Sequence, residues 1–536
     1  MKQINKAGNR LYKNRYSILY FSFFILHFPI VFCQAPDISY PTVFRLTAGK
    51  AIVPVFPVNN GGEVPSVAYG TTTTLAGSTR GFANGSGNNA AFNFPQGITV
   101  DASGIIYVAD RNNHRIRKVL PDGSTSTVAG TGNGTFSNGE ALTVATFNQP
   151  SDVVSGTNGD LYVTEIGNHC VRKIAAGQVT TLSGVGSAGF ADGDGSVAKF
   201  NMPFAITMNS DGILFVADRY THRIRKVTPT GETSTFAGNG SVNGINAQGA
   251  NATFNNPVGI ASFGNMLYVG DYNNNLIRSI NAQQYVSTLA GCFCGGTADG
   301  TGTEAGFTNP FGLAVGPSGD IFVADYNANL IRRISPKGEV TTLAGSGIAG
   351  NTNGVGNAAS FRTPADVAVD QDGNVYVADY ANHLIRKIIS TGYTISPALP
   401  SGLILDPATG QISGTPLEET PSGIYTVIAY NKYGKSITSF ELDVQSSNTA
   451  IESVKNDLLF VMYPNPLGAE ILHIQIPIHL QDQQIRIVIY DATGRMLFEN
   501  IYRKHTGTIQ IQPNFLGSNP FVFVEVSGVG IQKLIW

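Results

Sequence analysis

An acidic residue and an arginine recur seven positions apart at six places in the chain. The pairs are Asp110/Arg117, Glu165/Arg172, Asp218/Arg225, Asp271/Arg278, Asp325/Arg332 and Asp379/Arg386. A catalytic site is expected to be asymmetric, with one copy that departs from the rest, so six equivalent pairs favour architecture. We interpret them as buried or half-buried ion pairs that hold adjacent strands, because a charge-assisted pair needs such fixed geometry.

A histidine or an asparagine also recurs four positions after each acid. They are His114, His169, His222, Asn275, Asn329 and His383. A neutral histidine and an asparagine both offer a hydrogen-bond donor and an acceptor, so a turn hydrogen bond explains their exchange. Metal ligation by the histidines is the alternative interpretation.

A third set directly follows each acid. Its members are Arg111, Ile166, Arg219, Tyr272, Tyr326 and Tyr380. A ring of Tyr and Arg suits contact with a glycan or a peptide. Packing between neighbouring units explains the same aromatic residues and is favoured. We therefore name Arg111, Arg219, Tyr272, Tyr326 and Tyr380 as candidate binding residues.

Other candidate ligands are sparse. Asp192 and Asp194 carry the oxygen atoms that calcium prefers, and Asp299 lies in a similar loop, but the full spacing of a calcium loop is absent. Turn formation explains these residues better, so no metal site is assigned. Cys292 and Cys294 could form a metal-binding pair or a strained disulfide. We favour a loop in which they have no role, because no matching His or Cys pair lies nearby.

The elements that position these residues come from a repeat. Phe-x-x-Pro recurs at Pro95, Pro150, Pro203, Pro257, Pro310 and Pro364, at intervals of 53–55 residues. Each copy predicts four short antiparallel strands separated by Gly, Asn and Asp turns, which is a propeller blade. The fourth-strand pattern of residues 72–77 precedes the first copy, and the sixth copy lacks one. The early strand should therefore complete the last blade and close a ring of six.

The repeats resemble the NHL family across residues 71–388. Tyr107-Val108-Ala109-Asp110, followed by Asn113 to Lys118, is close to that family's consensus. The resemblance implies an all-β, six-bladed β-propeller and leaves the activity open. Some propeller enzymes with NHL-like blades hold a metal with channel histidines. The histidines here precede the third strand, and the expected inner strands contain no His or Glu, which disfavours a lactonase or lyase.

The flanking segments resemble a split Ig-like domain. Residues 390–445 contain Asp406 to Pro416 and Tyr425 to Asn431, which are similar to the Ig-like domains of bacterial surface proteins. The first strands of that domain, expected near Tyr40-Pro41 and Gly61-Gly62, would come from residues 36–69. The alternative is a loose N-terminal arm. Insertion of a propeller with adjacent ends favours the split domain.

The last segment, residues 458–536, follows a polar linker at 446–457. Its Tyr463-Pro464-Asn465-Pro466 and Tyr490 to Arg495 stretches resemble the C-terminal sorting domain of the type IX secretion system of Bacteroidetes. The resemblance implies export across the outer membrane by the type IX secretion machinery. An ordinary small β-sandwich is the alternative.

The N-terminus and the composition also favour export of the protein. Residues 1–33 have a basic start and an apolar stretch that resemble a signal peptide, with cleavage before Gln34 favoured over acylation of Cys33. Charged residues are 13% of the chain and the formal net charge is −2, which disfavours nucleic-acid binding. Only Cys170, Cys292 and Cys294 would remain in the mature chain, an odd number that is no disulfide framework.

These observations predict a secreted or outer-membrane-surface protein with no transmembrane segment in the mature chain. Its propeller face would bind a glycan, a peptide or a protein, without catalysis and without a cofactor. A propeller enzyme of the lactonase or lyase type, with a metal in the central channel, is the alternative, and a purely structural adhesin or matrix spacer is a third.

Overall fold

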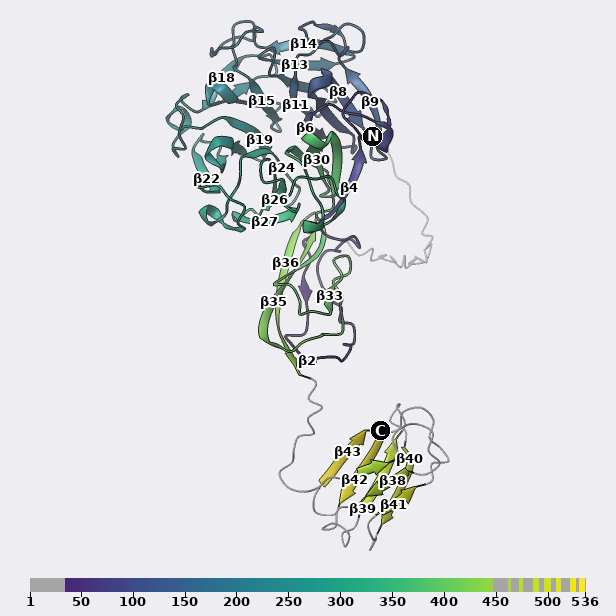
Figure 1. Ribbon diagram of the computed structural model, residues 1–536. Coiled ribbons are helices and arrows are strands. Elements are labelled where there is room, and N and C mark those ends of the chain that lie inside the picture. Colours follow the sequence, from purple (N-terminus) through teal and green to yellow (C-terminus); the bar gives the residue numbers. More distant parts are fainter. Residues whose placement is uncertain are drawn as a thin grey trace, which may run out of the picture. The chain divides into compact units, whose positions relative to one another are not determined.

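The computed structural model describes residues 34–446 and, beyond them, only the strands β37–β43 (Figure 1). The predicted signal peptide at residues 1–33 and residues 447–457 of the predicted linker lie outside the described residues. The chain divides into two compact units with the boundary between Gln445 and Ser446. In the described ranges no helix is long and apolar enough to cross a membrane.

The larger unit contains six sheets that form the blades of a propeller. Every blade begins at a repeated proline with an inner strand. The inner strands are β6 (Pro95–Val100), β11 (Pro150–Ser155), β15 (Pro203–Met208), β19 (Pro257–Phe263), β24 (Pro310–Val315) and β29 (Pro364–Val369). Proline suits this position because its missing N–H costs no ladder bond at the start of a strand.

The second and third strands of each blade carry the repeated acid and arginine. The second strands are β7 (Ile106–Asp110), β12 (Leu161–Glu165), β16 (Leu214–Asp218), β20 (Met266–Asp271), β25 (Ile321–Asp325) and β30 (Val375–Asp379). The third strands are β8 (Arg115–Val119), β13 (Cys170–Ala175), β17 (Arg223–Val227), β21 (Leu276–Ile280), β26 (Leu330–Ile334) and β31 (Leu384–Ile388). Neighbouring strands pair antiparallel, so the acid and the arginine of each blade lie on adjacent strands.

The outer strand closes the ring as the strand count predicts. Five blades use β9 (Ser124–Ala129), β14 (Gln178–Ser183), β18 (Thr233–Ala237), β22 (Val286–Ala290) and β27 (Glu339–Ala344). The sixth blade uses β4 (Thr71–Ala76), which pairs with β31 and lies, in purple, beside the green strands of that blade in Figure 1. The first and last blades are thereby joined without an open edge.

The expectation of four strands per blade is too low for four of the blades. A fifth, two-residue strand pairs with the outer strand, where the long Gly-rich loop folds back. These strands are β5 (Gly85–Ser86), β10 (Gly139–Glu140), β23 (Gly300–Thr301) and β28 (Gly354–Val355). Single 3-10 turns complete the loops, namely η1 (Gly87–Asn89), η2 (Arg111–Asn113), η3 (Arg219–Thr221), η4 (Gly249–Asn251), η5 (Tyr272–Asn274), η6 (Gly302–Glu304), η7 (Gly356–Ala358) and η8 (Tyr380–Asn382).

Two segments that flank the propeller in sequence share one further domain. Strand β2 (Val43–Thr47) pairs parallel with β36 (Gly434–Gln445), in the sheet order β2-β36-β35-β32. The remaining strands are β1 (Ile38–Ser39), β3 (Val58–Asn59), β32 (Gly392–Ser396), β33 (Leu403–Leu405), β34 (Ile412–Gly414) and β35 (Thr420–Asn431). Their apolar side chains form one core that includes Ile38, Phe44, Val427 and Phe440.

A buried arginine lies between this domain and the fifth blade. The Arg333 guanidinium is 2.6 Å from the Asp320 carboxylate and 3.7 Å from the centre of the Tyr430 ring. The Tyr430 ring stacks on Tyr69 at 4.9 Å. Blade and Ig-like segment are therefore packed against each other through a charge-assisted, aromatic contact.

The second unit consists of two sheets in its described strands. The first has the order β37-β38-β41 and the second β40-β39-β42-β43. The strands are β37 (Val461–Tyr463), β38 (Leu472–Gln475), β39 (Ile485–Tyr490), β40 (Met496–Tyr502), β41 (Thr508–Ile511), β42 (Phe521–Val526) and β43 (Gly530–Ile535). Most of the Pro-Asn-Pro and Gly-Arg signatures lie outside the described residues.

Candidate functional site

All six acid–arginine pairs are formed, and both side chains of every pair are buried. In the first blade, Arg117 Nη1 is 2.9 Å from Asp110 Oδ2 and also donates to the Ala91 carbonyl. Arg117 Nη2 donates to the Ala83 carbonyl and to Asn84 Oδ1. The guanidinium thus ties the long loop to the blade that it enters, and four acceptors offset its desolvation.

Arg172 and Arg386 show the same arrangement in the second and sixth blades. Arg172 Nη1 donates to Glu165, and its Nη2 donates to Asn138 Oδ1 at 2.7 Å. Arg386 Nη1 is 2.9 Å from Asp379 Oδ2, and its Nη2 donates to the Thr352 carbonyl at 3.0 Å. These arginines pair with the acid of the adjacent strand, as the sequence predicts. Each of them also fastens the preceding long loop, because a guanidinium has five donors and one carboxylate cannot use them all.

The Nε atom of these arginines differs from the Nη atoms. This atom is buried without a hydrogen bond in all six, namely in Arg117, Arg172, Arg225, Arg278, Arg332 and Arg386. Only the Nη groups of these arginines have hydrogen-bond acceptors. An unmatched buried N–H costs free energy, so each pair contributes less stability than a fully bonded guanidinium would.

The phenylalanine of the repeated Phe-x-x-Pro completes this structural site. Each paired arginine lies 5.1–5.4 Å from the centre of one such ring. Phe92, Phe147, Phe200, Phe254, Phe307 and Phe361 are fully buried. Burial raises the pKa of Asp110 to about 6, and the Asn93 N–H and Arg117 oppose that shift. Six copies of one enclosed arrangement hold the blades together, and none of these guanidinium groups is open to a ligand.

The repeated His and Asn residues link each blade to the next. The backbone N–H of Gln149 donates to His114 Nδ1 at 3.2 Å, and that of Asn309 donates to Asn275 Oδ1 at 2.9 Å. The equivalent bonds run from Met202 to His169, from Asn256 to His222, from Thr363 to Asn329 and from Phe94 to His383. The hydrogen bond expected inside a turn is therefore wrong in its partner, which lies on the neighbouring blade. Burial lowers the pKa of these histidines, which favours the neutral, accepting form.

The five candidate binding residues lie around the propeller axis, on the face formed by the long loops. Tyr272, Tyr326 and Tyr380 are half-buried and pack against an apolar cluster that contains Phe204 and Phe311. The Tyr326 and Phe311 rings stack at 4.7 Å, and Tyr272 meets Phe311 edge-on at 5.6 Å. These tyrosines therefore pack, as the favoured interpretation predicts, and each keeps part of its surface exposed, while contact with a ligand stays a prediction.

The two arginines of this ring differ from the six buried ones. Arg111 Nη1 donates to Gln96 Oε1 at 2.9 Å and lies 3.4 Å from the Tyr380 hydroxyl. The Arg219 guanidinium lies 5.1 Å from the Phe204 ring and 5.4 Å from the Tyr272 ring. Both side chains are half-buried, and among the described residues neither has a carboxylate partner. The charge of both guanidinium groups is therefore not neutralised by a neighbouring carboxylate, and that of Arg219 lies against aromatic rings.

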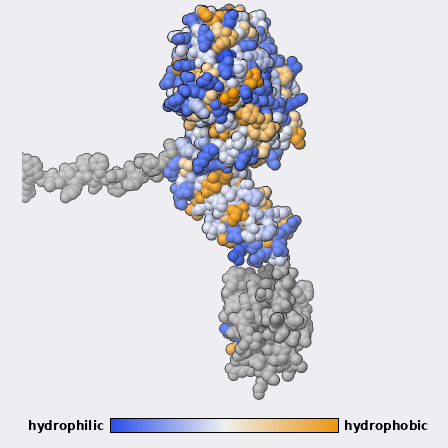
Figure 2. All heavy atoms as spheres, turned by 90° about the vertical axis from the view of Figure 1, so that its left-hand side faces the viewer, coloured by the Kyte–Doolittle hydropathy of each residue, from blue (hydrophilic) through white to orange (hydrophobic). Residues whose placement is uncertain are grey.

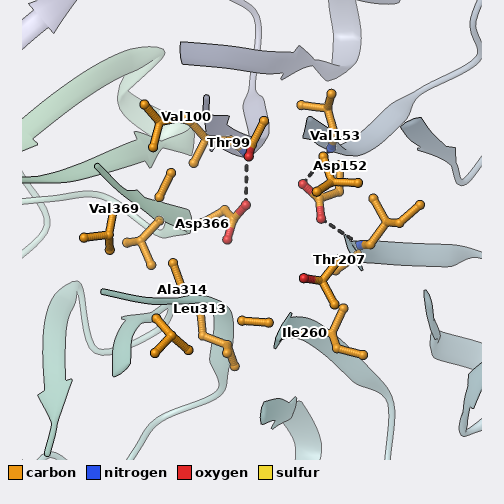
Figure 3. Close-up of a pocket in the computed structure, with 18 of the residues that line it drawn as sticks. Thr99, Val100, Asp152, Val153, Thr207, Ile260, Leu313, Ala314, Asp366 and Val369 are labelled. Atoms are coloured by element: carbon orange, nitrogen blue, oxygen red, sulfur yellow. Dashed lines mark hydrogen bonds between the residues drawn. The ribbon is translucent and has the colours of Figure 1, made fainter. Parts of the chain in front are cut away.

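A cavity of about 160 Å³ occupies the central channel behind this ring. The inner strands line it with Val, Ile, Ala and Thr side chains, and Asp152 and Asp366 project into it (Figure 3). Asp152 accepts the N–H groups of Val153 and Ile206, at 2.7 and 2.8 Å. Asp366 Oδ2 accepts the N–H of Ile98 at 2.9 Å. The cavity has room for several water molecules beside the two carboxyl groups.

The two carboxyl groups influence each other's ionisation. Burial raises the pKa of Asp152 to about 7, against the two N–H donors. Burial and then the charge of Asp152 raise the pKa of Asp366 well above its usual range. The pair therefore retains a proton near neutral pH, which is the state that general acid–base chemistry uses.

The sequence analysis missed these two residues, although they depart from the repeat. The equivalent position, two residues after the repeated proline, holds Gly97, Ala205, Gly259 and Gly312 in the other blades. A Cβ atom on Gly97 would clash with the Asp152 carboxylate, and one on Gly312 would clash with that of Asp366. The asymmetry between blades was the signal that could have identified them.

Two family models match the chain. The NHL repeat model matches residues 92–119 and 147–174, which cover the inner, second and third strands of the first two blades. The model described as Putative Ig domain matches residues 342–445. The chain carries NHL repeats and an Ig-like domain. The second match begins inside the propeller, whereas the Ig-like sheet also takes β2 from the N-terminal segment.

Known proteins resemble the NHL propeller at moderate identity. NHL repeat-containing protein 2 of Bos taurus is 30% identical over 346 residues, which are 56% of this chain and 47% of that protein. The chain thus spans about half the length of this curated relative. A structural genomics protein of unknown function from Bacteroides thetaiotaomicron is 17% identical, with a TM-score of 0.48, covering 66% of this chain and 98% of that one. An auxiliary nutrient binding protein from Bacteroides ovatus has 16% identity and a TM-score of 0.46, with the same coverages.

The acidic residues of the long loops form ion pairs with blade arginines or stabilise turns. Asp192 pairs with Arg225 Nη2, and Asp299 pairs with Arg332 Nη2 at 2.9 Å. Asp194 accepts the N–H and the hydroxyl of Ser196, which is turn chemistry. No cluster of three or more His, Cys, Asp or Glu side chains suited to a metal occurs in the described part of the chain.

The cysteines correct one interpretation. Cys292 and Cys294 form a disulfide, so the loop that contains them is cross-linked rather than without a role. Cys170 is buried and free.

Proposed function

We propose that this protein is a non-catalytic binding scaffold that presents the long-loop face of its propeller to a glycan, a peptide or a protein. One observation carries the proposal. Arg111, hydrogen-bonded to Gln96, and Arg219, packed on Phe204 and Tyr272, have no carboxylate partner among the described residues, whereas each of the six buried blade arginines has its own acid. Aromatic and arginine side chains with spare charge and exposed ring surface are the usual energetic centres of binding sites.

The proposed address is the cell exterior. The expected signal peptide at residues 1–33 and the expected type IX sorting domain at 458–536 support secretion or display on the outer-membrane surface. Mass spectrometry of the chain termini in fractionated cells tests this part. A mature N-terminus at Gln34 in the outer-membrane or medium fraction is expected, and an intact N-terminus in the cytoplasm would contradict it.

The binding function is tested with the full-length chain on glycan and peptide arrays. Wild type is compared with Arg219→Ala and Tyr326→Ala, which change the ring, and with Tyr285→Ala, an exposed tyrosine in the turn between β21 and β22. We expect the first two variants to lose the array signal and the control to keep most of it. Equal signals for all four proteins, or none for wild type, would contradict a binding role for this ring.

A propeller enzyme is the second candidate because of the channel carboxyl pair. Asp152 and Asp366 supply a proton donor and an acceptor beside a cavity of about 160 Å³. A catalytic metal held by three protein ligands does not fit, since the channel offers two carboxylates as its donor set. Assays with lactone and lyase substrates separate the two candidates. Turnover that is abolished in Asp366→Asn would favour the enzyme, and no turnover by wild type would favour the scaffold.

A further inference from the structure

The charges of the long-loop face are unevenly distributed among the blades. Three of the loops that follow an outer strand contain acids, at Glu140, at Asp192 and Asp194, and at Asp299 and Glu304. The loops at residues 77–94 and 345–363 contain no Asp or Glu and contribute Arg80 and Arg362. These two loops flank the inner strands of the first and sixth blades. The face is therefore basic over that sector.

The basic residues of this sector meet around two aromatic rings. Arg80 lies 5.3 Å from the centre of the Phe94 ring, and its Nε donates to Asn93 Oδ1 at 3.0 Å. The Phe94 ring lies 4.7 Å from that of Tyr380, whose hydroxyl lies 3.4 Å from Arg111 Nη1. Three contacts thus connect Arg80 to Arg111 through half-exposed aromatic side chains.

Arg362 completes the group from the neighbouring loop. It is exposed, and its backbone N–H donates at 2.9 Å to Oδ1 of Asp379, the residue that precedes Tyr380. We define the arginine patch as Arg80, Arg111 and Arg362 with Phe94 and Tyr380. In the described ranges the patch arginines form no ion pair, and the acids beneath them, Asp110 and Asp379, are buried against their own arginines. The patch therefore carries uncompensated positive charge.

From this arrangement we propose that the arginine patch binds an acidic glycan, whose uronate or sulfate groups meet the guanidinium groups while its sugar rings lie on Phe94 and Tyr380. The inference rests on the binding function proposed above and names its ligand class. Each acidic sugar offers an anion and an apolar ring face together, which matches the alternation of arginine and aromatic ring. A run of acidic amino acids offers the anions alone and leaves both aromatic rings without a partner. Guanidinium suits carboxylate and sulfate because it donates two parallel hydrogen bonds.

Figure 2 shows another feature of the surface that bears on the choice of ligand. On the side that it displays, apolar residues form small groups interrupted by hydrophilic ones. Exposed apolar residues such as Phe82, Phe136 and Phe190 are each held over an arginine. A hydrated, charged polymer fits such a surface better than a broad apolar partner.

The test measures binding of the full-length chain to polygalacturonate and chondroitin sulfate by calorimetry, with dextran as the neutral polysaccharide and poly-glutamate as the acidic peptide. The double variant Arg80→Gln/Arg362→Gln removes two exposed charges and leaves the blade pairs intact. The control is Arg45→Gln, which removes an exposed arginine from β2 in the Ig-like domain. We expect the double variant to weaken binding to the acidic polysaccharides about tenfold at low salt, and the control to leave it unchanged.

The salt dependence of binding gives a second measurement, because salt screens the attraction between exposed charges. The difference between wild type and the double variant should shrink in about 0.5 M NaCl, a concentration at which the Debye length is about 4 Å. Dextran binding as tight as polygalacturonate binding, and unchanged in the double variant, would overturn the ligand class while leaving the binding function in place. Tighter binding of poly-glutamate than of either acidic polysaccharide would replace a glycan by a peptide. Failure of both acidic polysaccharides to bind would overturn the inference, and the arrays described above then decide the binding function separately.

Discussion

Two sets of arginines on one propeller have opposite environments. Arg117 and its five equivalents are fully buried, and each has a carboxylate, carbonyl oxygens and a polar loop side chain as acceptors for its Nη groups. Arg219 is half-buried on aromatic rings and has no carboxylate partner in the described residues. The first arrangement recurs in every blade, and the second occurs where blades differ. Buried, compensated charge stabilises the blades, whereas the proposed binding face carries charge without an ion-pair partner.

Removal of a buried arginine is expected to have the largest effect on stability. Arg278→Met leaves the buried Asp271 carboxylate without its ion-pair partner, which should cost about 3–5 kcal/mol. Chemical denaturation of the full chain, followed in the propeller transition, measures it. Arg219→Met is the matched control and should cost less than about 1 kcal/mol. Equal losses of stability in the two variants would contradict the inference that only the buried arginines hold the propeller together.

Arg333 is an intermediate case, since it is buried and compensated but occurs in one blade. Arg333→Gln removes its ion pair with Asp320 and its contact with the Tyr430 ring. We expect a loss of about 2–3 kcal/mol, accompanied by earlier proteolysis between propeller and Ig-like domain. The control is Lys226→Gln, the equivalent position of the third blade, which should change little. Unchanged proteolysis in Arg333→Gln would mean that this arginine does not couple the two domains.

The channel pair should make stability depend on pH. The folded state raises the pKa of Asp152 to about 7 and that of Asp366 well above its usual range. The unfolded chain releases these protons above about pH 4, so stability falls as the pH rises from about 4 to about 7. Asp366→Asn keeps an acceptor for the Ile98 N–H and should stabilise the protein by about 1–3 kcal/mol at pH 8, with little effect at pH 5.

The control for this prediction is Asp122→Asn. Asp122 lies in an exposed turn, and hydrogen bonds from Ser124 lower its pKa. Its substitution should change stability equally at pH 5 and pH 8. Thermal melts at pH 5 and pH 8 measure the stability of both variants. If Asp366→Asn gains the same stability at both pH values, the channel pair holds no extra proton.

The smallest effect is expected at the bonds between blades. Burial lowers the pKa of His222, so the unfolded chain takes up a proton near pH 6.5 before the folded state does. Stability is therefore lost as the pH falls through about 6.5. His222→Asn, which copies the residue of the fourth and fifth blades, should be neutral at pH 7.5 and stabilising by about 0.5 kcal/mol at pH 5.5. Asn275→His should introduce the opposite dependence, and melts of both variants across this range check the pair.

Much of the fold was predictable because it repeats locally. The interval of the prolines, the four main strands of each blade and the completion of the last blade by residues 71–76 follow from the pattern. The acid–arginine contacts were predictable as well, because seven residues connect adjacent strands of a tight hairpin. Their further bonds to the long loops were not, since Arg172 and Arg386 reach acceptors more than thirty positions away. The fifth strands were missed, since two residues such as Gly85 and Ser86 carry no periodicity.

The sequence by itself determined the contacts inside a blade, because strand alternation and hairpin length bring those residues together wherever the blade lies. Only the tertiary structure decided the contacts between blades: that His114 accepts from Gln149, that Asp152 and Asp366 face one channel, and that Arg80 and Arg111 share a patch with Tyr380. Those partners are far apart in the chain, and closing the ring sets their spacing. The arrangement of the candidate binding site belongs to this second class, since its residues come from loops of five different blades.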